Sequence, residues 1–156
     1  MKKECVYIKK MTNAILFLFC WLAMSSNIAN DQSDELSVIM NAESQINELP
    51  FKELKTILKG EKQRWKDGTK ISLAMMKTNT AVGGIISKKV YDMTSDQLNK
   101  YWLALVFQGK ATAPVFFDSE DEVKAYVLRT KGALGVISYD GIKNDKVVLI
   151  DGKKFF

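Results

Sequence analysis

The sequence of 156 residues contains no histidine, and its two cysteines, Cys5 and Cys20, both stand near the N-terminus. Without histidine the chain lacks the most common general acid or base and a frequent zinc ligand. Beyond residue 29 it also lacks a thiol, which excludes disulfides and thiol catalysis there. No carboxylates are paired at a spacing suited to acid-base work. We therefore expect no enzymatic activity, no metal site and no cofactor.

Arginine is also scarce, because it occurs only at Arg64 and Arg129. The formal charge of the whole chain is 23 − 18 = +5, but four lysines and Glu4 fall within residues 1–29. The remainder carries 19 − 17 = +2. A nucleic-acid-binding protein needs a concentrated basic surface, so this balance predicts no nucleic-acid partner.

The N-terminal segment is typical of a secretory signal. A lysine-rich start precedes an apolar run from Ala14 to Met24, and no second long apolar run follows. A run of about 11 residues fits the hydrophobic region of a signal peptide and is too short to span a bilayer comfortably. We therefore expect a signal peptide over residues 1–29, cleaved near 25 or 29. Cleavage there would leave a single domain over residues 30–156. We also expect a periplasmic location and no membrane span in the mature protein.

Apolar periodicity predicts alternating strands and helices. Helices are expected from Pro50 to Gly60, after the loop 77–81, from Thr94 to Gly109 and after Ser119. Thr94 with Gln97, and Ser119 with Glu122, have the spacing of capping boxes. The expected strands span 36–41, 70–76, 134–138 and 146–150, and the expected aromatic core residues are Trp65, Tyr101, Trp102, Phe107, Phe116 and Phe117. This order predicts an α/β domain with parallel crossovers.

Two loops are candidate ligand sites, because α/β sheets bind ligands beyond the carboxyl ends of their strands. One loop is 41–44, and the other, 77–81, precedes an expected helix whose N-terminal N–H groups favour an anion. Thr78, Asn79 and Thr80 would add neutral donors there, and Lys77 would add a cation. Alternatively, one of the three neutral residues caps its own helix. Ser44 has the same two interpretations, as a ligand donor or as part of a turn.

Four motifs in order resemble the substrate-binding proteins of phosphate ABC transporters, specifically their short stand-alone periplasmic relatives. The resemblance covers about residues 36 to 150. Its motifs are Phe51 to Trp65, the Asp67-Gly68 turn with the following strand, Tyr101-Trp102 with Phe107 and Gly109, and Lys131 to Val136.

The resemblance implies a short form of the type 2 periplasmic-binding-protein fold, with a mixed sheet flanked by helices. It also implies that phosphate or a similar oxyanion is held by hydroxyl and backbone N–H groups without a metal. The family's anion loop would correspond to Thr78, Asn79, Thr80 and Ala81, and the turn after the first strand to Ala42, Glu43 and Ser44.

The sequence departs from the family in three ways. The chain is too short for two complete lobes, and its loop offers Lys77 where the family uses arginine. Glu43 would repel an oxyanion unless turned away or protonated, or unless it accepts the proton of monohydrogen phosphate.

The sequence supports two functional hypotheses. The first is an exported, non-catalytic solute-binding protein for phosphate or a similar oxyanion, working with an ABC permease or another envelope protein. The alternative is an envelope scaffold or interaction protein that retains the fold without a ligand. Convergence of Ser44 with Thr78, Asn79 and Thr80 on one pocket would favour binding.

Overall fold

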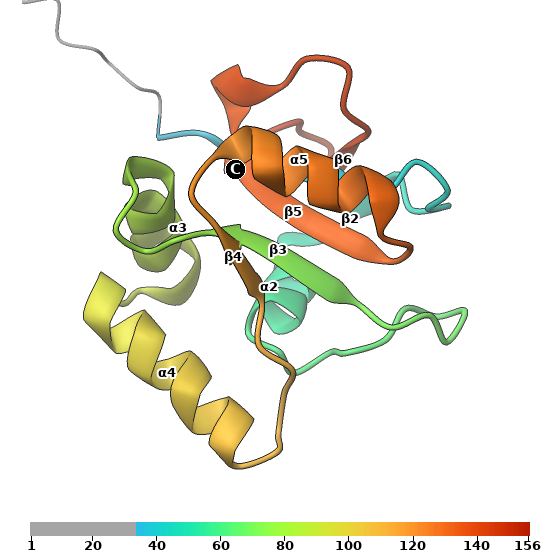
Figure 1. Ribbon diagram of the computed structural model, residues 1–156. Coiled ribbons are helices and arrows are strands. Elements are labelled where there is room, and N and C mark those ends of the chain that lie inside the picture. The colour runs from blue at the N-terminus through green and yellow to red at the C-terminus, as the bar shows by residue number, and fades with distance from the viewer. Residues whose placement is uncertain (1–33) are drawn as a thin grey trace, which may run out of the picture. The chain divides into compact units, whose positions relative to one another are not determined.

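The computed structural model describes residues 34–156, which form one unit around a six-stranded sheet (Figure 1). The expected signal peptide lies outside these residues. The strand order is β2-β6-β1-β5-β3-β4. The strands span Leu36–Met40 (β1), Glu48–Leu49 (β2), Ser72–Met76 (β3), Val115–Phe117 (β4), Ala133–Ser138 (β5) and Val147–Ile150 (β6).

The helices begin and end near their expected signals. They span Phe51–Leu58 (α2), Ala81–Tyr91 (α3), Ser95–Phe107 (α4) and Glu120–Arg129 (α5), with a 3-10 turn at Tyr139–Gly141 (η1). Both capping boxes are present at the starts of α4 and α5. Gly60, with φ of 75°, follows α2 as the left-handed residue that a helix end favours.

Helices cover both faces of the sheet. In Figure 1, α5 crosses in front of β5, and α2 lies behind the sheet. The core between these layers is apolar: β1 and β5 are buried along their whole length, and Leu54, Ile57 and Leu58 fill it from α2. The C-terminal tail also packs, because Phe156 exchanges backbone hydrogen bonds with Leu36 at 3.2 and 3.0 Å.

The sheet is mixed, so the expectation of parallel crossovers holds for only part of it. β5, β3 and β4 are parallel neighbours, as are β2 and β6. β1 instead runs antiparallel to both of its neighbours, β5 and β6. The direction of β1 determines which edge of the sheet its following loop occupies.

Sequence patterns missed two strands and misplaced one aromatic residue. β2 and β4 have only two and three residues, which is too short for an alternating pattern to register. Phe107 was expected in the core, and this is wrong, since it is 83% exposed at the end of α4. Trp65 and Trp102 are buried as expected.

Candidate functional site

Three loops gather where the parallel strands β3, β4 and β5 end. Met76 is paired with Phe117, and Ala74 with Gly135, so these strands finish at the same side of the sheet. We call this side the carboxyl edge and define it by residues 77–81, 118–119 and 138–141. Such an edge is where α/β sheets bind ligands.

The first of these loops folds tightly over the start of α3. The Thr80 hydroxyl donates to the Lys77 carbonyl oxygen at 2.7 Å and accepts from the Gly83 N–H at 3.0 Å. A Cβ atom at Gly83 would lie 1.9 Å from that Lys77 oxygen, so only glycine fits there. Thr80 is therefore the N-cap of α3, and its hydrogen is committed to the loop.

The remaining side chains of the loop point to neighbouring elements. The Thr78 hydroxyl donates to Asn99 Oδ1 of α4 at 3.2 Å, and the Ser95 hydroxyl donates to the Thr78 carbonyl at 2.8 Å. Lys77 Nζ lies 2.7 Å from Asp118 Oδ2, and both side chains are largely exposed. A solvent-exposed pair of this kind is weak, so Lys77 can exchange partners readily.

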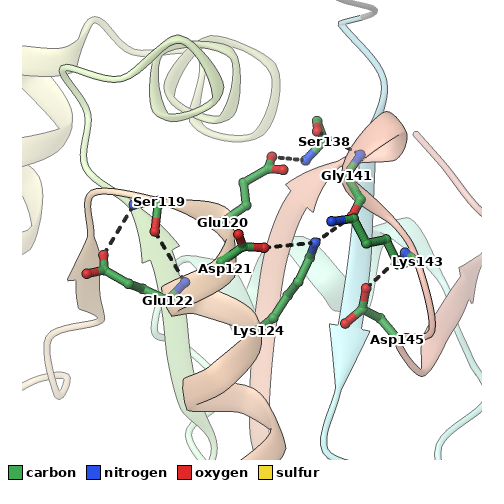
Figure 2. A network of polar contacts seen from close by, with 9 residues as sticks. All are labelled: Ser119, Glu120, Asp121, Glu122, Lys124, Ser138, Gly141, Lys143 and Asp145. Carbon is green, nitrogen blue, oxygen red and sulfur yellow. Dashed lines mark hydrogen bonds and ion pairs between the residues drawn. The ribbon is translucent and has the colours of Figure 1, made fainter.

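At the other two loops, the chain's own carboxylates occupy the backbone N–H groups (Figure 2). Glu122 Oε2 accepts from the Ser119 N–H at 3.3 Å, and it also accepts from the Asp118 N–H at 3.0 Å. Glu120 Oε1 accepts from the Ser138 N–H at 2.7 Å. An outside anion would meet negative charge at both places.

The start of α3 is therefore the part of the carboxyl edge best suited to an anion. Ala81 and Val82 occupy the first two helical positions, where no preceding carbonyl of the helix can accept their N–H groups. The positive end of the helix dipole points the same way. Asn79 and Ala81 are exposed, and Lys77 is exposed beside them.

Glu43 and Ser44 lie at the opposite edge of the sheet. Met40 at the end of β1 pairs with Leu134, which also pairs with Leu73 near the start of β3. The loop after β1 is thus separated from the loop after β3 by the length of β3, about 13 Å. Ser44 therefore does not converge with Thr78, Asn79 and Thr80 on one pocket, the arrangement that would have favoured binding, because β1 is antiparallel to β5 and β5 is parallel to β3.

A separate cavity of about 620 Å³ adjoins Glu43 and Ser44. Trp65 contributes to its wall, together with the ion pair between Lys62 Nζ and Glu53 Oε1 at 2.5 Å. Ser44 closes a turn here: its hydroxyl oxygen accepts from the Ile46 N–H at 3.2 Å. Hydrogen bonds from Thr69 lower the pKa of Asp67, another lining residue. The lining mixes carboxylates with lysines, so its charge does not favour anions over cations.

Comparison with solved structures identifies this architecture. The structure is similar to that of a putative phosphate ABC transporter substrate-binding protein of Clostridium perfringens with bound phosphate (TM-score 0.58, 16% identity). It is also similar to PstS of Borrelia burgdorferi (0.59, 20%) and to an ABC-type phosphate transport receptor of Vibrio cholerae (0.59, 18%). The chain has the fold of phosphate ABC transporter substrate-binding proteins. The fold expected from the sequence motifs is thereby confirmed.

The structural similarity extends over most of this chain but over only part of each compared protein. The similarity covers 76%, 76% and 78% of this chain but only 46%, 48% and 48% of the three proteins. The aligned part of this chain thus spans less than half the length of each of these proteins. No protein-family profile and no curated protein matches the sequence.

Two features are absent from residues 34–156, the part of the chain that the structure describes. No helix in this part of the chain is long and apolar enough to cross a membrane. Within the same residues, no cluster of three or more acidic side chains is arranged to hold a metal ion.

Proposed function

We propose that this protein is an exported, non-catalytic solute-binding protein that binds phosphate or a similar oxyanion at the loop between β3 and α3. The observation that carries the proposal is the start of α3, where the N–H groups of the exposed Ala81 and the buried Val82 have no acceptor within the helix and lie beside the exposed Lys77. The fold shared with phosphate-binding proteins supports the same ligand class. The proposal includes cleavage of a signal peptide, a periplasmic location and a permease or another envelope protein as partner.

The loop residues have different roles in this proposal. Ala81 and Val82 donate backbone hydrogen bonds to the anion, and Asn79 donates through its exposed side-chain amide. Lys77 leaves Asp118 and adds a charge-assisted hydrogen bond. Thr80 shapes the loop through its cap and does not contact the anion, because its hydrogen is held by the Lys77 carbonyl.

Thr78 has a conditional role. Its hydroxyl donates to Asn99 Oδ1 at 3.2 Å, which is longer than hydroxyl hydrogen bonds usually are, so this bond is weak. An anion at the start of α3 would offer a stronger, charged acceptor. In the proposed complex, the Thr78 hydroxyl turns from Asn99 to the anion.

Calorimetric titration of the purified protein with phosphate, and separately with sulfate, tests the proposal. Ala81→Pro removes one backbone donor at a helix position that favours proline, and Thr80 already has the extended backbone that a following proline requires (φ −86°, ψ 160°). We expect Ala81→Pro to weaken phosphate binding by about tenfold, the effect of one hydrogen bond to a charged group. Ala81→Ser keeps the N–H group and is the matched control.

A charge variant gives a second, independent test of the site. Lys77→Gln should weaken phosphate binding, whereas Lys88→Gln, which alters an exposed lysine in the last turn of the same helix, should leave it unchanged. Glu43→Gln should change neither affinity nor the preference between phosphate and sulfate, because Glu43 lies at the other edge of the sheet. Absence of saturable binding by either anion would refute the proposal.

A second candidate function is an envelope scaffold that retains the fold without a ligand. The observation that favours it is the placement of Glu120 and Glu122, which fill two N–H-rich positions of the carboxyl edge with internal carboxylates. Failure of both anions to bind or to raise the melting temperature at millimolar concentration would favour the scaffold.

A further inference from the structure

The cavity beside Glu43 and Ser44 lies at the edge of the sheet opposite the proposed anion site. Residues from three segments line it, within 41–50, 62–69 and 131–132. Its volume of about 620 Å³ lies within the range of small-molecule sites, which combine apolar walls with a few polar groups. We call it the Trp65 cavity. The proposed anion binding makes no use of it.

Trp65 gives this cavity a fixed aromatic wall. The indole Nε1 donates to the Gly132 carbonyl oxygen at 3.0 Å, which holds the ring in one orientation. Lys62 Nζ lies 5.8 Å from the centre of the same ring. The apolar side chains of Ile46 and Leu49 also line the cavity. A ligand that fills the cavity therefore needs an apolar part that packs against these side chains.

Charged groups of both signs line the same cavity. Lys62 Nζ and Glu53 Oε1 lie 2.5 Å apart, and these side chains are 29% and 31% exposed. Asp67 is held by Thr69, whose N–H and hydroxyl donate to the two carboxylate oxygens at 2.9 Å each. These bonds and, to a smaller extent, the charge of Lys131 lower the pKa of Asp67, so its carboxylate stays ionised at neutral pH. Such a lining is complementary to a ligand that itself carries both a positive and a negative group.

The edge strand β2 adds backbone hydrogen-bonding groups. β2 is one of the two outermost strands of the described sheet, and its residue Glu48 lines the cavity. The carbonyl oxygens of Asn47 and Leu49 accept hydrogen bonds from the β6 side at 2.9 and 3.2 Å. Neighbouring residues of a strand direct their backbone groups to opposite sides, so the N–H and C=O of Glu48 face away from β6. A free strand edge of this kind pairs with extended peptide backbone.

We propose that the Trp65 cavity binds a short zwitterionic peptide, with its ammonium group at Asp67, its carboxylate at Lys62 and an apolar side chain against Trp65. A lysine ammonium has three donors, so Lys62 keeps donors for the peptide carboxylate beside its bond to Glu53. The free backbone groups of Glu48 pair with the peptide backbone. A single amino acid carries the same two charges but fills less of the cavity, so it binds more weakly. Anion binding at the start of α3 is independent of this site, because the two lie at opposite edges of the sheet.

Calorimetric titration of the purified protein with the tripeptide Ala-Leu-Ala, with and without millimolar phosphate, tests the inference. We expect saturable binding of the same strength in both buffers. The N-acetylated peptide and the C-terminal amide each lack one charge and should bind about threefold to tenfold more weakly, the effect of one hydrogen-bonded charge at a partly exposed site. Free leucine should bind more weakly than the tripeptide.

Combining protein variants with the modified peptides tests the assigned orientation. Asp67→Asn should weaken binding of Ala-Leu-Ala and should no longer distinguish the free from the acetylated N-terminus. Lys62→Gln should in the same way no longer distinguish the free C-terminus from the amide. Asp96→Asn and Lys88→Gln alter exposed residues of α4 and α3, so these matched controls should leave the affinity unchanged. The melting temperature of each variant serves as the folding control.

Each outcome decides for or against the peptide site. Binding that phosphate does not affect, and that depends on both charged ends through Asp67 and Lys62, supports the inference. Absence of saturable binding by Ala-Leu-Ala at millimolar concentration overturns it, whatever the phosphate titration gives. Binding that both variants leave unchanged, or that phosphate displaces, overturns it as well, since the peptide then lies outside the Trp65 cavity. Tighter binding of free leucine than of the tripeptide would also contradict it.

Discussion

Two neighbouring glycines in the first turn of α3 should respond oppositely to the same substitution. In a helix, replacing glycine by alanine normally stabilises a protein by about 0.5–1 kcal/mol. At Gly84 nothing lies within 4 Å of the added Cβ atom, so Gly84→Ala should gain that amount. At Gly83 the added atom would lie 1.9 Å from the Lys77 carbonyl oxygen and 2.9 Å from Thr80 Oγ1.

Gly83→Ala should therefore open the loop over α3. The substitution breaks the cap in which Thr80 accepts from the Gly83 N–H at 3.0 Å and donates to the Lys77 carbonyl at 2.7 Å. Loss of a helix cap costs about 0.5–2 kcal/mol, and the second hydrogen bond contributes about 1 kcal/mol. After subtracting the helix gain, we expect a net destabilisation of about 1–2 kcal/mol.

Urea unfolding of the wild type and both variants, followed by circular dichroism, measures this difference. The two alanine variants should differ by about 2–3 kcal/mol, with the wild type between them. Equal stabilisation by both substitutions would refute the close approach of the loop to α3. Phosphate affinity should fall in Gly83→Ala and stay unchanged in Gly84→Ala, because only the former displaces Lys77.

Three further predictions concern the scaffold. Burial raises the pKa of Tyr91 far above its ordinary value near 10. The contribution of the Tyr91 phenol to the free energy of unfolding is therefore complete below about pH 10 and declines at higher pH. Urea unfolding should give a lower free energy at pH 11 than at pH 8, and Tyr91→Phe should make that difference smaller. Ser119→Ala removes the cap of α5 and should lower the free energy of unfolding by about 1 kcal/mol, whereas an unchanged value would contradict the capping box. Asn41→Ala should cost about 2–3 kcal/mol in the same assay, because the buried Asn41 amide donates to the carbonyls of Val127 and Leu128 at 3.0 and 2.9 Å; a loss under 0.5 kcal/mol would show that water replaces these bonds.

The sequence predicted the helices well because their signals are local. The capping boxes that begin α4 and α5 lie within four consecutive residues each, and both are present in the structure. The glycine after α2 likewise acts at short range. Such features depend little on the rest of the fold.

The direction of β1 could not be obtained in this way. It depends on pairing with β5, about a hundred residues further along the chain. The hydrophobic pattern of a buried strand is the same in either direction, so it carries no information on orientation. Because β1 is antiparallel to β5, Glu43 and Ser44 lie at the edge of the sheet opposite the predicted anion loop.

The candidate site was predicted in part for the same reason. The position of residues 77–81 before a helix follows from local pattern, and the structure has that loop at the start of α3. The capture of the Ser138 N–H by Glu120 depends on how α5 lies against β5. No spacing rule connects two residues that meet only through packing of a helix on a sheet.

The most direct test of the anion site is a phosphate titration of ¹⁵N-labelled protein, followed by the backbone amide resonances. We expect saturable shifts centred on Ala81 and Val82, with smaller changes over residues 77–80, and none at Glu43 or Ser44. The Ser138 and Ser119 amides should stay in place, because Glu120 and Glu122 hold them. Unchanged Ala81 and Val82 resonances at millimolar phosphate, or shifts centred on the cavity beside Glu43, would contradict this expectation.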